Sequence, residues 1–269
     1  MLELAKSIGL SEKLISEISY LDGKEVSLLS DKCLSKGFCC LRKKKNTLCT
    51  AVILECAKRA RAFYDVKGIP ENIYYDTFSD IKIWAEKCRK EKSFNYGWLQ
   101  NHCKGELFRL GRLQFQVYPC RNKTLFYKKL PFSYGENLIY VHIPEGEKLT
   151  YESCVEALQQ SKAFFSSFFP EYEYRYYFCE SWLLFEDNKE FMKKDSNILS
   201  FASLFTHAYS VKIDAQAIER IFGKRRLFIK DYPEKTSLQK SAKAFMKSGG
   251  KPGIGIGYID KEWVYQPGT

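Results

Sequence analysis

The sequence reads L-I-Y-V-H-I over residues 138–143, P-E-G-E-K-L-T over 144–150 and Y-E-S-C-V-E-A-L-Q-Q-S-K-A-F-F-S-S-F over 151–168. The first run is apolar, rich in residues that favour strands, and stops at Pro144, which predicts a buried strand. The third run has apolar residues at helical spacing and follows Thr150, a good helix N-cap. The stretch therefore predicts a strand, a short loop and a long helix that ends at Pro170.

Strands and helices continue to alternate on both sides of this stretch. Upstream, the apolar residues between Leu107 and Val117 predict strand structure. Downstream, we expect strands over 174–184, 198–209, 227–229 and 254–259, and helices over 187–192, 215–222 and 236–246. This alternation is typical of a layered α/β domain, which we place at residues 105–269.

The first 104 residues have a different pattern. Residues 48–64 carry apolar side chains with the 3.6-residue period of a helix with one buried face, and Gly68 and Pro70 end it. Further helical segments follow over 73–87 and 95–104. We therefore expect a helical N-terminal domain over residues 1–104.

The net charge of the chain limits which classes of partner are expected. Lys and Arg number 43 against 32 Asp and Glu, a net charge of +11, which could attract nucleic acid, a membrane or a phosphate-bearing co-substrate. The basic residues are scattered, and only 42–45 and 224–226 form clusters, without a helix-turn-helix, zinc-finger or RNP-type pattern. We interpret both clusters as solvated loops and helix ends, so nucleic acid is not favoured as a partner and no membrane is expected.

The ten cysteines of the chain bear on the cellular compartment in which the protein is expected. No Cys-x-x-Cys pair occurs and no histidine lies among the five cysteines between residues 33 and 56, so no metal site is predicted. Residues 1–18 follow a helical rhythm rather than that of a secretory signal, and no stretch approaches the roughly 20 apolar residues of a membrane span. The cysteines are interpreted as free thiols, and the protein is expected in the cytoplasm.

Two residues on predicted strands are candidates for acid–base chemistry. His142 lies at the carboxyl end of its strand, where open α/β sheets bind ligands, although a lone histidine can equally be a structural hydrogen-bonding group. Glu180 interrupts an apolar strand next to Ser181; alternation favours a solvent-facing side chain, and the alternative is a pocket that raises its pKa. Ser196 and Asn197 could cap a helix or bind a ligand.

The glycine-rich stretch 249–257 suggests a phosphate loop, but it leads into a strand instead of a helix. Turn and bulge glycines explain it better.

Several phrases together resemble a bacterial family of acyltransferase domain-containing proteins, which pair an N-acyltransferase N-terminal domain with a GNAT-like C-terminal domain. The phrases are Y-D-T-F-S-D-I at 75–81, L-F-R-L-G-R-L-Q-F at 107–115, V-H-I-P at 141–144, F-F at 164–165 with F-P at 169–170, C-E-S-W-L-L at 179–184 and S-N-I-L at 196–199. The resemblance implies a helical domain followed by a GNAT-like mixed, mainly antiparallel sheet flanked by helices, of the α/β (α+β) class.

The resemblance also implies acyl transfer from acetyl-CoA or another acyl-CoA to an amine of a small-molecule or peptide acceptor. It implies Glu180, His142 and Ser181 as catalytic residues, with Glu180 or His142 as the base. Coenzyme A would contact Ile143, Thr150, Ser196 and Asn197. Arg109, Arg112 and Gln114 would either bind a charged part of the acceptor or tie the two domains together, and the arginines suit both roles equally.

The sequence departs from this family at one point. Residues 143–150 lack the glycine-rich pyrophosphate loop of ordinary GNAT enzymes and contain two glutamates. A catalytically inactive, GNAT-like binding module for a small molecule or a protein is therefore a second hypothesis. Nucleic-acid binding through the two basic clusters is a third.

Overall fold

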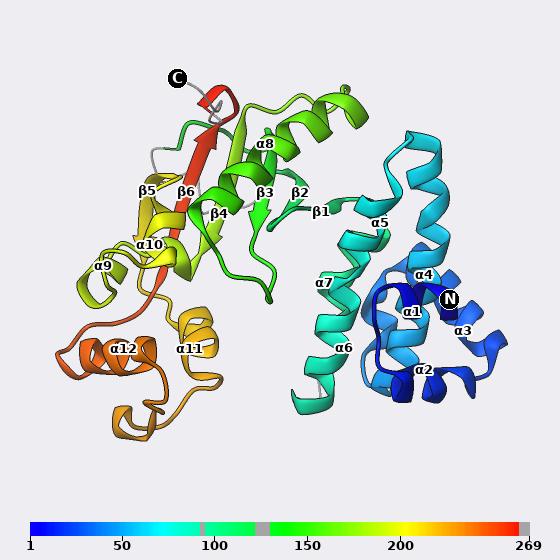
Figure 1. The fold of residues 1–269 in the computed structure, drawn as a ribbon, viewed down its shortest axis with the longest axis horizontal. Coiled ribbons are helices and arrows are strands. Elements are labelled where there is room, and N and C mark those ends of the chain that lie inside the picture. Colours follow the sequence, from blue (N-terminus) through cyan, green and yellow to red (C-terminus); the bar gives the residue numbers. More distant parts are fainter. Residues whose placement is uncertain (92–94, 122–129, 264–269) are drawn as a thin grey trace. The chain divides into compact units, whose positions relative to one another are not determined.

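The computed structural model describes residues 1–91, 95–121 and 130–263 (Figure 1). The chain divides into two compact units. The first unit comprises Met1–Val117, Ile143–Gly146 and Phe164–Pro170, and the second comprises Tyr118–His142, Glu147–Ala163 and Glu171–Thr269.

The first unit is mainly helical and contains one β-hairpin. Its elements are α1 Leu2–Ser7, α2 Glu12–Ser19, α3 Gly23–Lys36, η1 Phe38–Leu41, α4 Asn46–Lys67, α5 Glu71–Phe78, α6 Asp80–Glu91, α7 Tyr96–Cys103, β1 Leu107–Leu110 and β2 Leu113–Pro119, whose last two residues belong to the second unit. Side-chain caps begin several helices; Asn95, for example, accepts a hydrogen bond from the Trp98 backbone N–H. The α4 helix ends at Gly68, whose left-handed φ of 69° is available to glycine at little cost.

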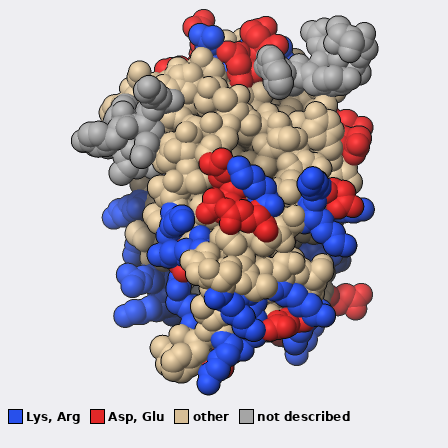
Figure 2. All heavy atoms as spheres, turned by 90° about the vertical axis from the view of Figure 1, so that its left-hand side faces the viewer, with Lys and Arg blue, Asp and Glu red and all other residues tan. Residues whose placement is uncertain are grey.

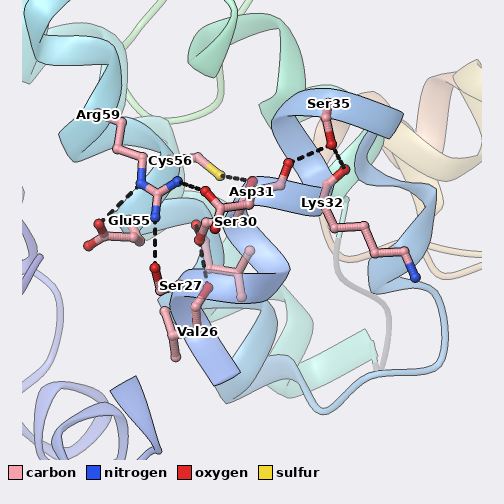
Figure 3. A network of polar contacts seen from close by, with 10 residues as sticks. Val26, Ser27, Ser30, Asp31, Lys32, Ser35, Glu55, Cys56 and Arg59 are labelled. Carbon is pink, nitrogen blue, oxygen red and sulfur yellow. Dashed lines mark hydrogen bonds and ion pairs between the residues drawn. The ribbon is translucent and has the colours of Figure 1, made fainter. Parts of the chain in front are cut away.

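Helices α3 and α4 are joined by polar contacts around Arg59 (Figure 3). Its guanidinium donates to Glu55 on its own helix and to Ser27 and Asp31 on α3. Cys56 donates a weak hydrogen bond to the Ser30 carbonyl, with the sulfur 3.9 Å from the oxygen. This contact between helices agrees with the buried helical face expected for residues 48–64.

An aromatic core holds the β-hairpin onto the helices of this unit. The Phe108 ring on β1 lies with its centroid 5.9 Å from that of Tyr64 on α4, and 4.8 Å and 5.2 Å from those of Phe164 and Phe169. All four side chains are buried. Such aromatic pairs add attraction beyond the area that they bury.

The second unit contains the remaining strands and the helices that cover them. Its elements are β3 Asn137–His142, α8 Tyr151–Phe168 (of which 164–168 belong to the first unit), β4 Tyr176–Ser181, η3 Trp182–Leu184, α9 Asn188–Phe191, α10 Asn197–Ala202, β5 Thr206–Val211, α11 Ala215–Phe222, η4 Ile229–Asp231, α12 Ser237–Lys247, β6 Ile254–Asp260 and η5 Lys261–Trp263. The strands lie in the order β3-β4-β6-β5. Strands β3 and β4 are parallel, whereas β4 with β6 and β5 with β6 are antiparallel, as is the β1–β2 hairpin. The expected mixed, mainly antiparallel sheet flanked by helices is confirmed.

Alternation along β4 gives the strand two different faces. The Tyr177 hydroxyl accepts a hydrogen bond from Ser161 of α8, so α8 covers the face of the odd-numbered residues (Figure 1). On the other face, Tyr176 and Phe178 pack with Leu138 and Ile256 in a separate apolar cluster. The side chain of Glu180 follows this second face.

Two predicted strands are wrong in part, and a third is wrong altogether. Residues 182–184 form the 3-10 helix η3, and 197–202 form the helix α10, because Ser196 caps it by accepting the Ile198 backbone N–H. Residues 227–229 form no strand; Leu227 and Phe228 lie in an exposed loop, and Ile229 is the first residue of η4. An apolar run alone does not distinguish these outcomes.

The glycines of β6 allow close packing. A Cβ on Gly255 would lie 1.9 Å from the carbonyl oxygen of Leu184, so η3 approaches the strand backbone as only glycine permits.

Candidate functional site

Strands β3 and β4 separate at their carboxyl ends. Their parallel pairing runs from Leu138 opposite Tyr176 to Tyr140 opposite Phe178. Beyond that point β3 continues to His142, whereas β4 continues to Ser181 in register with β6. The carboxyl ends of parallel strands are where open sheets bind ligands.

His142 and Glu180 both border the Tyr140 side chain at this opening. The Tyr140 ring stacks on the His142 imidazole with centroids 4.0 Å apart, and its hydroxyl donates to the Glu180 backbone carbonyl at 3.4 Å. Tyr118 meets Tyr140 edge-on, with centroids 5.4 Å apart. The structure thus brings both candidate bases to one aromatic surface of the second unit.

Glu180 is half-buried, which is closer to the pocket interpretation than to the solvent-facing one. Burial raises the pKa of its carboxyl group because charge is less well solvated there than in water. Burial likewise raises the pKa of Tyr118, Tyr140 and Tyr209, and the Glu180 charge adds to each shift. The site can therefore supply a carboxylate base and, at neutral pH, protonated phenols.

Ser181 is placed differently from Glu180. It follows the opposite face of β4, is buried, and its hydroxyl accepts the Leu183 backbone N–H at 3.2 Å, which caps η3. Ser196 caps α10, which packs against η3, and Asn197 is the first residue of that helix.

The predicted coenzyme A stretch is shared between the two units. Ile143–Gly146 belongs to the first, and Glu147–Thr150 belongs to the second. Thr150 accepts the Ser153 backbone N–H at 3.2 Å and so caps α8. A helix N-terminus attracts anions, but Glu147 before it and Glu152 in the first turn oppose that field, whereas Lys148 adds to it.

The predicted acceptor-binding residues lie in the hairpin of the first unit. Arg112 is buried and donates to the Pro144 carbonyl at 2.9 Å. The half-buried Arg109 donates to the Gly111 carbonyl and to Ser79 through its side chain. Gln114 is buried, with its side-chain nitrogen 3.5 Å from Nε2 of His102.

Gln114 belongs to a buried polar network around Asp80, a residue that is only 2% exposed. Trp98 donates to that carboxylate at 2.6 Å, Trp84 at 3.3 Å, and Nε2 of His102 lies 3.2 Å from it. Burial acts to raise the pKa of Asp80, but the hydrogen bond and charge of His102, with donation from Trp98 and Gln114, outweigh burial and hold the pKa below its ordinary value. This network fastens α6, α7 and β2 together.

The tyrosines around Glu180 were missed by sequence reasoning. Tyr118, Tyr140 and Tyr209 come from three different strands, and no local motif links them. Only the alternation along β3, which puts Tyr140 and His142 on one face, gave a signal.

In residues 1–91, 95–121 and 130–263, no group of three or more His, Cys, Asp or Glu is arranged to hold a metal ion. No helix in those ranges has the length and apolar character needed to cross a bilayer.

Comparison with known proteins identifies both parts of the chain. The family described as GNAT-like C-terminal domain matches residues 107–259, and the N-acyltransferase N-terminal domain family matches residues 23–105. No curated protein sequence matches the chain.

Similar solved structures include an acyltransferase in complex with decanoyl-CoA and teicoplanin, an acyltransferase mutant in complex with octanoyl-CoA, and an acyltransferase in complex with CoA and 10C-teicoplanin. Each is 21% identical, has a TM-score of 0.77, and covers 96% of this chain and 86% of its own. At this identity the likeness shows a shared fold.

Proposed function

Because the chain belongs to the family with an N-acyltransferase N-terminal domain and a GNAT-like C-terminal domain, we propose that it transfers an acyl group from an acyl-CoA to an amine. The observation that supports this most is the opening between β3 and β4, where Glu180 and His142 both border the Tyr140 side chain. The similar acyltransferases were solved with decanoyl-CoA, octanoyl-CoA and CoA, which favours an acyl-CoA donor here as well.

In the proposed mechanism, Glu180 takes a proton from the acceptor ammonium, and His142 is the other base that the geometry allows. The free amine attacks the thioester carbonyl, and backbone N–H groups at the end of β3 stabilise the oxyanion. Collapse breaks the carbon–sulfur bond and forms the amide. Tyr118, a phenol at neutral pH, donates a proton to the leaving thiolate and recovers the second proton that the attacking nitrogen loses as it becomes the amide.

The remaining candidate residues receive supporting roles in this proposal. Ser181 positions η3 next to Glu180, and Arg112 and Gln114 position the hairpin. Arg109, which is only half-buried, is the residue best suited to a charged group of the acceptor. Ile143 and Thr150 would contact coenzyme A, whereas Ser196 and Asn197 act as the start of α10.

The residues fit the two ends of coenzyme A unequally. The strand opening suits the thioester arm, but two glutamates precede the α8 cap and a third follows it. We assign no residue to the pyrophosphate, and these acids are the observation that favours a catalytically inactive binding module as a second candidate.

The acceptor and the cellular setting are also part of the proposal. Teicoplanin accompanies two of the similar enzymes, so a small molecule with a free amine is the proposed class of acceptor.

We place the domain boundary between residues 104 and 105, since α7 ends at Cys103 and β1 begins at Leu107. Nine cysteines of the described residues are free thiols, which supports the cytoplasm as the location.

A thiol-release assay tests this function. The purified protein is incubated with octanoyl-CoA and a panel of small-molecule amines, and free thiol is followed with Ellman's reagent. Glu180→Gln is the variant of the proposed base, and Glu190→Gln, on the exposed end of α9, is the matched control. Amine-dependent thiol release that Glu190→Gln retains and Glu180→Gln lacks supports acyl transfer; acyl-CoA binding without turnover supports the binding module.

A further inference from the structure

The second unit contains a strongly basic segment. Between Lys212 and Lys251 the sequence has eleven Lys and Arg residues against four Asp and Glu. Figure 2 shows Lys and Arg gathered over the lower part of one face of the molecule. Within this segment, residues 224–230 read K-R-R-L-F-I-K, and every one of these side chains is exposed.

The apolar side chains of this loop are unusually open to solvent. Leu227 is 86% exposed, Phe228 55% and Ile229 37%. Among the described residues, the other large exposed apolar side chains stand singly along the sequence: Tyr20, Leu28, Leu34, Val66, Tyr134, Tyr151 and Ile213. Single exposed apolar residues are ordinary, but three in a row mark an interaction surface.

Contacts at both ends of the loop fix its backbone. Lys243 on α12 is buried, and its ammonium donates to the carbonyls of Lys230 and Tyr232, both at 2.7 Å, and pairs with Glu234 at 2.8 Å. At the other end of the loop, Arg225 forms an ion pair with Asp214. A buried lysine satisfied in this way holds the backbone in place, so the apolar side chains are presented to solvent instead of collapsing onto the core.

The apolar cluster of α11 and α12 forms without the apolar side chains of this loop. Residues of α11 and α12 pack with Tyr232 in an apolar cluster formed by Ala217, Ile218, Ile221, Phe222, Tyr232 and Ala242. The Gln239 side chain donates to the Ile221 carbonyl at 3.0 Å and connects the two helices. Leu227, Phe228 and Ile229 are not members of this cluster.

We propose that residues 224–230 dock the protein on an anionic phospholipid bilayer. Anionic headgroups attract the four basic residues, and the boundary between headgroups and acyl chains accepts the three apolar ones. The Lys230 ammonium lies 5.5 Å from the centre of the Phe228 ring, so the cation and the apolar ring share one surface. A nucleic acid would neutralise the charges but leave the apolar side chains in water.

This surface changes one expectation from the sequence, in which membranes were not counted as partners. A surface-bound protein needs no spanning helix. The proposal is independent of acyl transfer, because it concerns binding alone.

Vesicle co-sedimentation of the full chain tests the proposal. The vesicles contain either phosphatidylcholine with phosphatidylglycerol or phosphatidylcholine alone. We expect binding to the anionic vesicles only. A Leu227→Ser/Phe228→Ser double variant should bind at least about tenfold more weakly, and so should Lys224→Glu/Arg226→Glu. Both pairs change exposed side chains only, and circular dichroism checks that each variant stays folded.

Val66→Ser is the matched control, because Val66 is 89% exposed on α4 and lies outside the basic segment. It should bind vesicles as the wild type does. The proposal is overturned if the wild type does not sediment with anionic vesicles, or if the Leu227→Ser/Phe228→Ser variant binds equally well. Preferential binding to short duplex DNA that this variant leaves unchanged would also overturn it and identify a nucleic-acid surface.

Discussion

The Tyr140 ring stacks on the His142 imidazole, with ring centroids 4.0 Å apart, at the point where β3 stops pairing with β4. The same tyrosine donates its hydroxyl to the backbone of Glu180. One side chain thus links the two strands that carry the candidate bases.

Glu180→Gln is expected to lower kcat by about 10²- to 10⁴-fold, the usual contribution of a general base, with little change in acyl-CoA affinity. His142→Gln should cost about tenfold or less if the imidazole mainly orients Tyr140. Steady-state kinetics with octanoyl-CoA would show the difference. A larger loss in the histidine variant would transfer the role of base from Glu180 to His142.

The activity of the wild type should fall toward acid as Glu180 takes up a proton. Because burial raises the pKa of Glu180, this fall is expected at a pH above its ordinary value of 4.5. The pH profile of kcat/KM measures it directly. If kcat/KM of Glu180→Gln still falls toward acid at the same pH, a group other than Glu180 causes the fall.

Glu180 should also affect stability with a definite sign. Since its folded pKa is raised, protonation stabilises the fold below pH 4.5, and this contribution is lost as pH rises through the folded pKa. At pH 8, Glu180→Gln should therefore be at least as stable as the wild type. Thermal unfolding at pH 5 and pH 8 compares the two proteins, and a variant markedly less stable at pH 8 would contradict this account.

Asp80→Ala should destabilise the first unit by about 3–5 kcal/mol, because it removes one partner of a buried network. Asp65→Ala, in an exposed pair with Arg61, is the control and should cost about 1 kcal/mol or less. The pKa of Asp80 is depressed, so its stabilisation is present above the ordinary carboxyl pKa of about 4 and lost as pH falls. Urea unfolding at pH 7 and at acid pH measures both effects. Equal losses of unfolding free energy in the two variants would show that the buried network stabilises the fold no more than an exposed ion pair does.

Gly255→Ala is expected to cost at least about 2 kcal/mol, since the new Cβ would overlap the Leu184 carbonyl. Gly97→Ala on α7 meets no atom within 4 Å and should leave stability unchanged or slightly increased. Thermal unfolding of the two variants gives the comparison. A neutral Gly255→Ala would mean that η3 can move away from β6.

The elements that the sequence predicted well are those with strong local signals. The strand at 138–143 and the helix capped by Thr150 were found because apolar periodicity and punctuation agreed. The sequence predicts a strand at residues 227–229, because an apolar triplet has the same pattern in a sheet and in an exposed loop. What holds that loop is Lys243, a tertiary contact 13 residues from Lys230.

The candidate site was accessible from the sequence only in part. His142 and Glu180 stood out as polar residues in apolar strands, and the structure places them on the same face. Ser181 stood out for the same reason, but its hydroxyl is used as a cap, which no pattern could indicate. The tyrosines around Glu180 depend on the strand order, and that order is a property of the whole fold.

Calorimetric titration with octanoyl-CoA and with free CoA, at low and at moderate salt, tests the central claim most directly. We predict saturable micromolar binding of both ligands that survives moderate salt and is retained in Glu180→Gln. No binding, or heat that disappears when salt is added, would contradict the proposed acyl-CoA site.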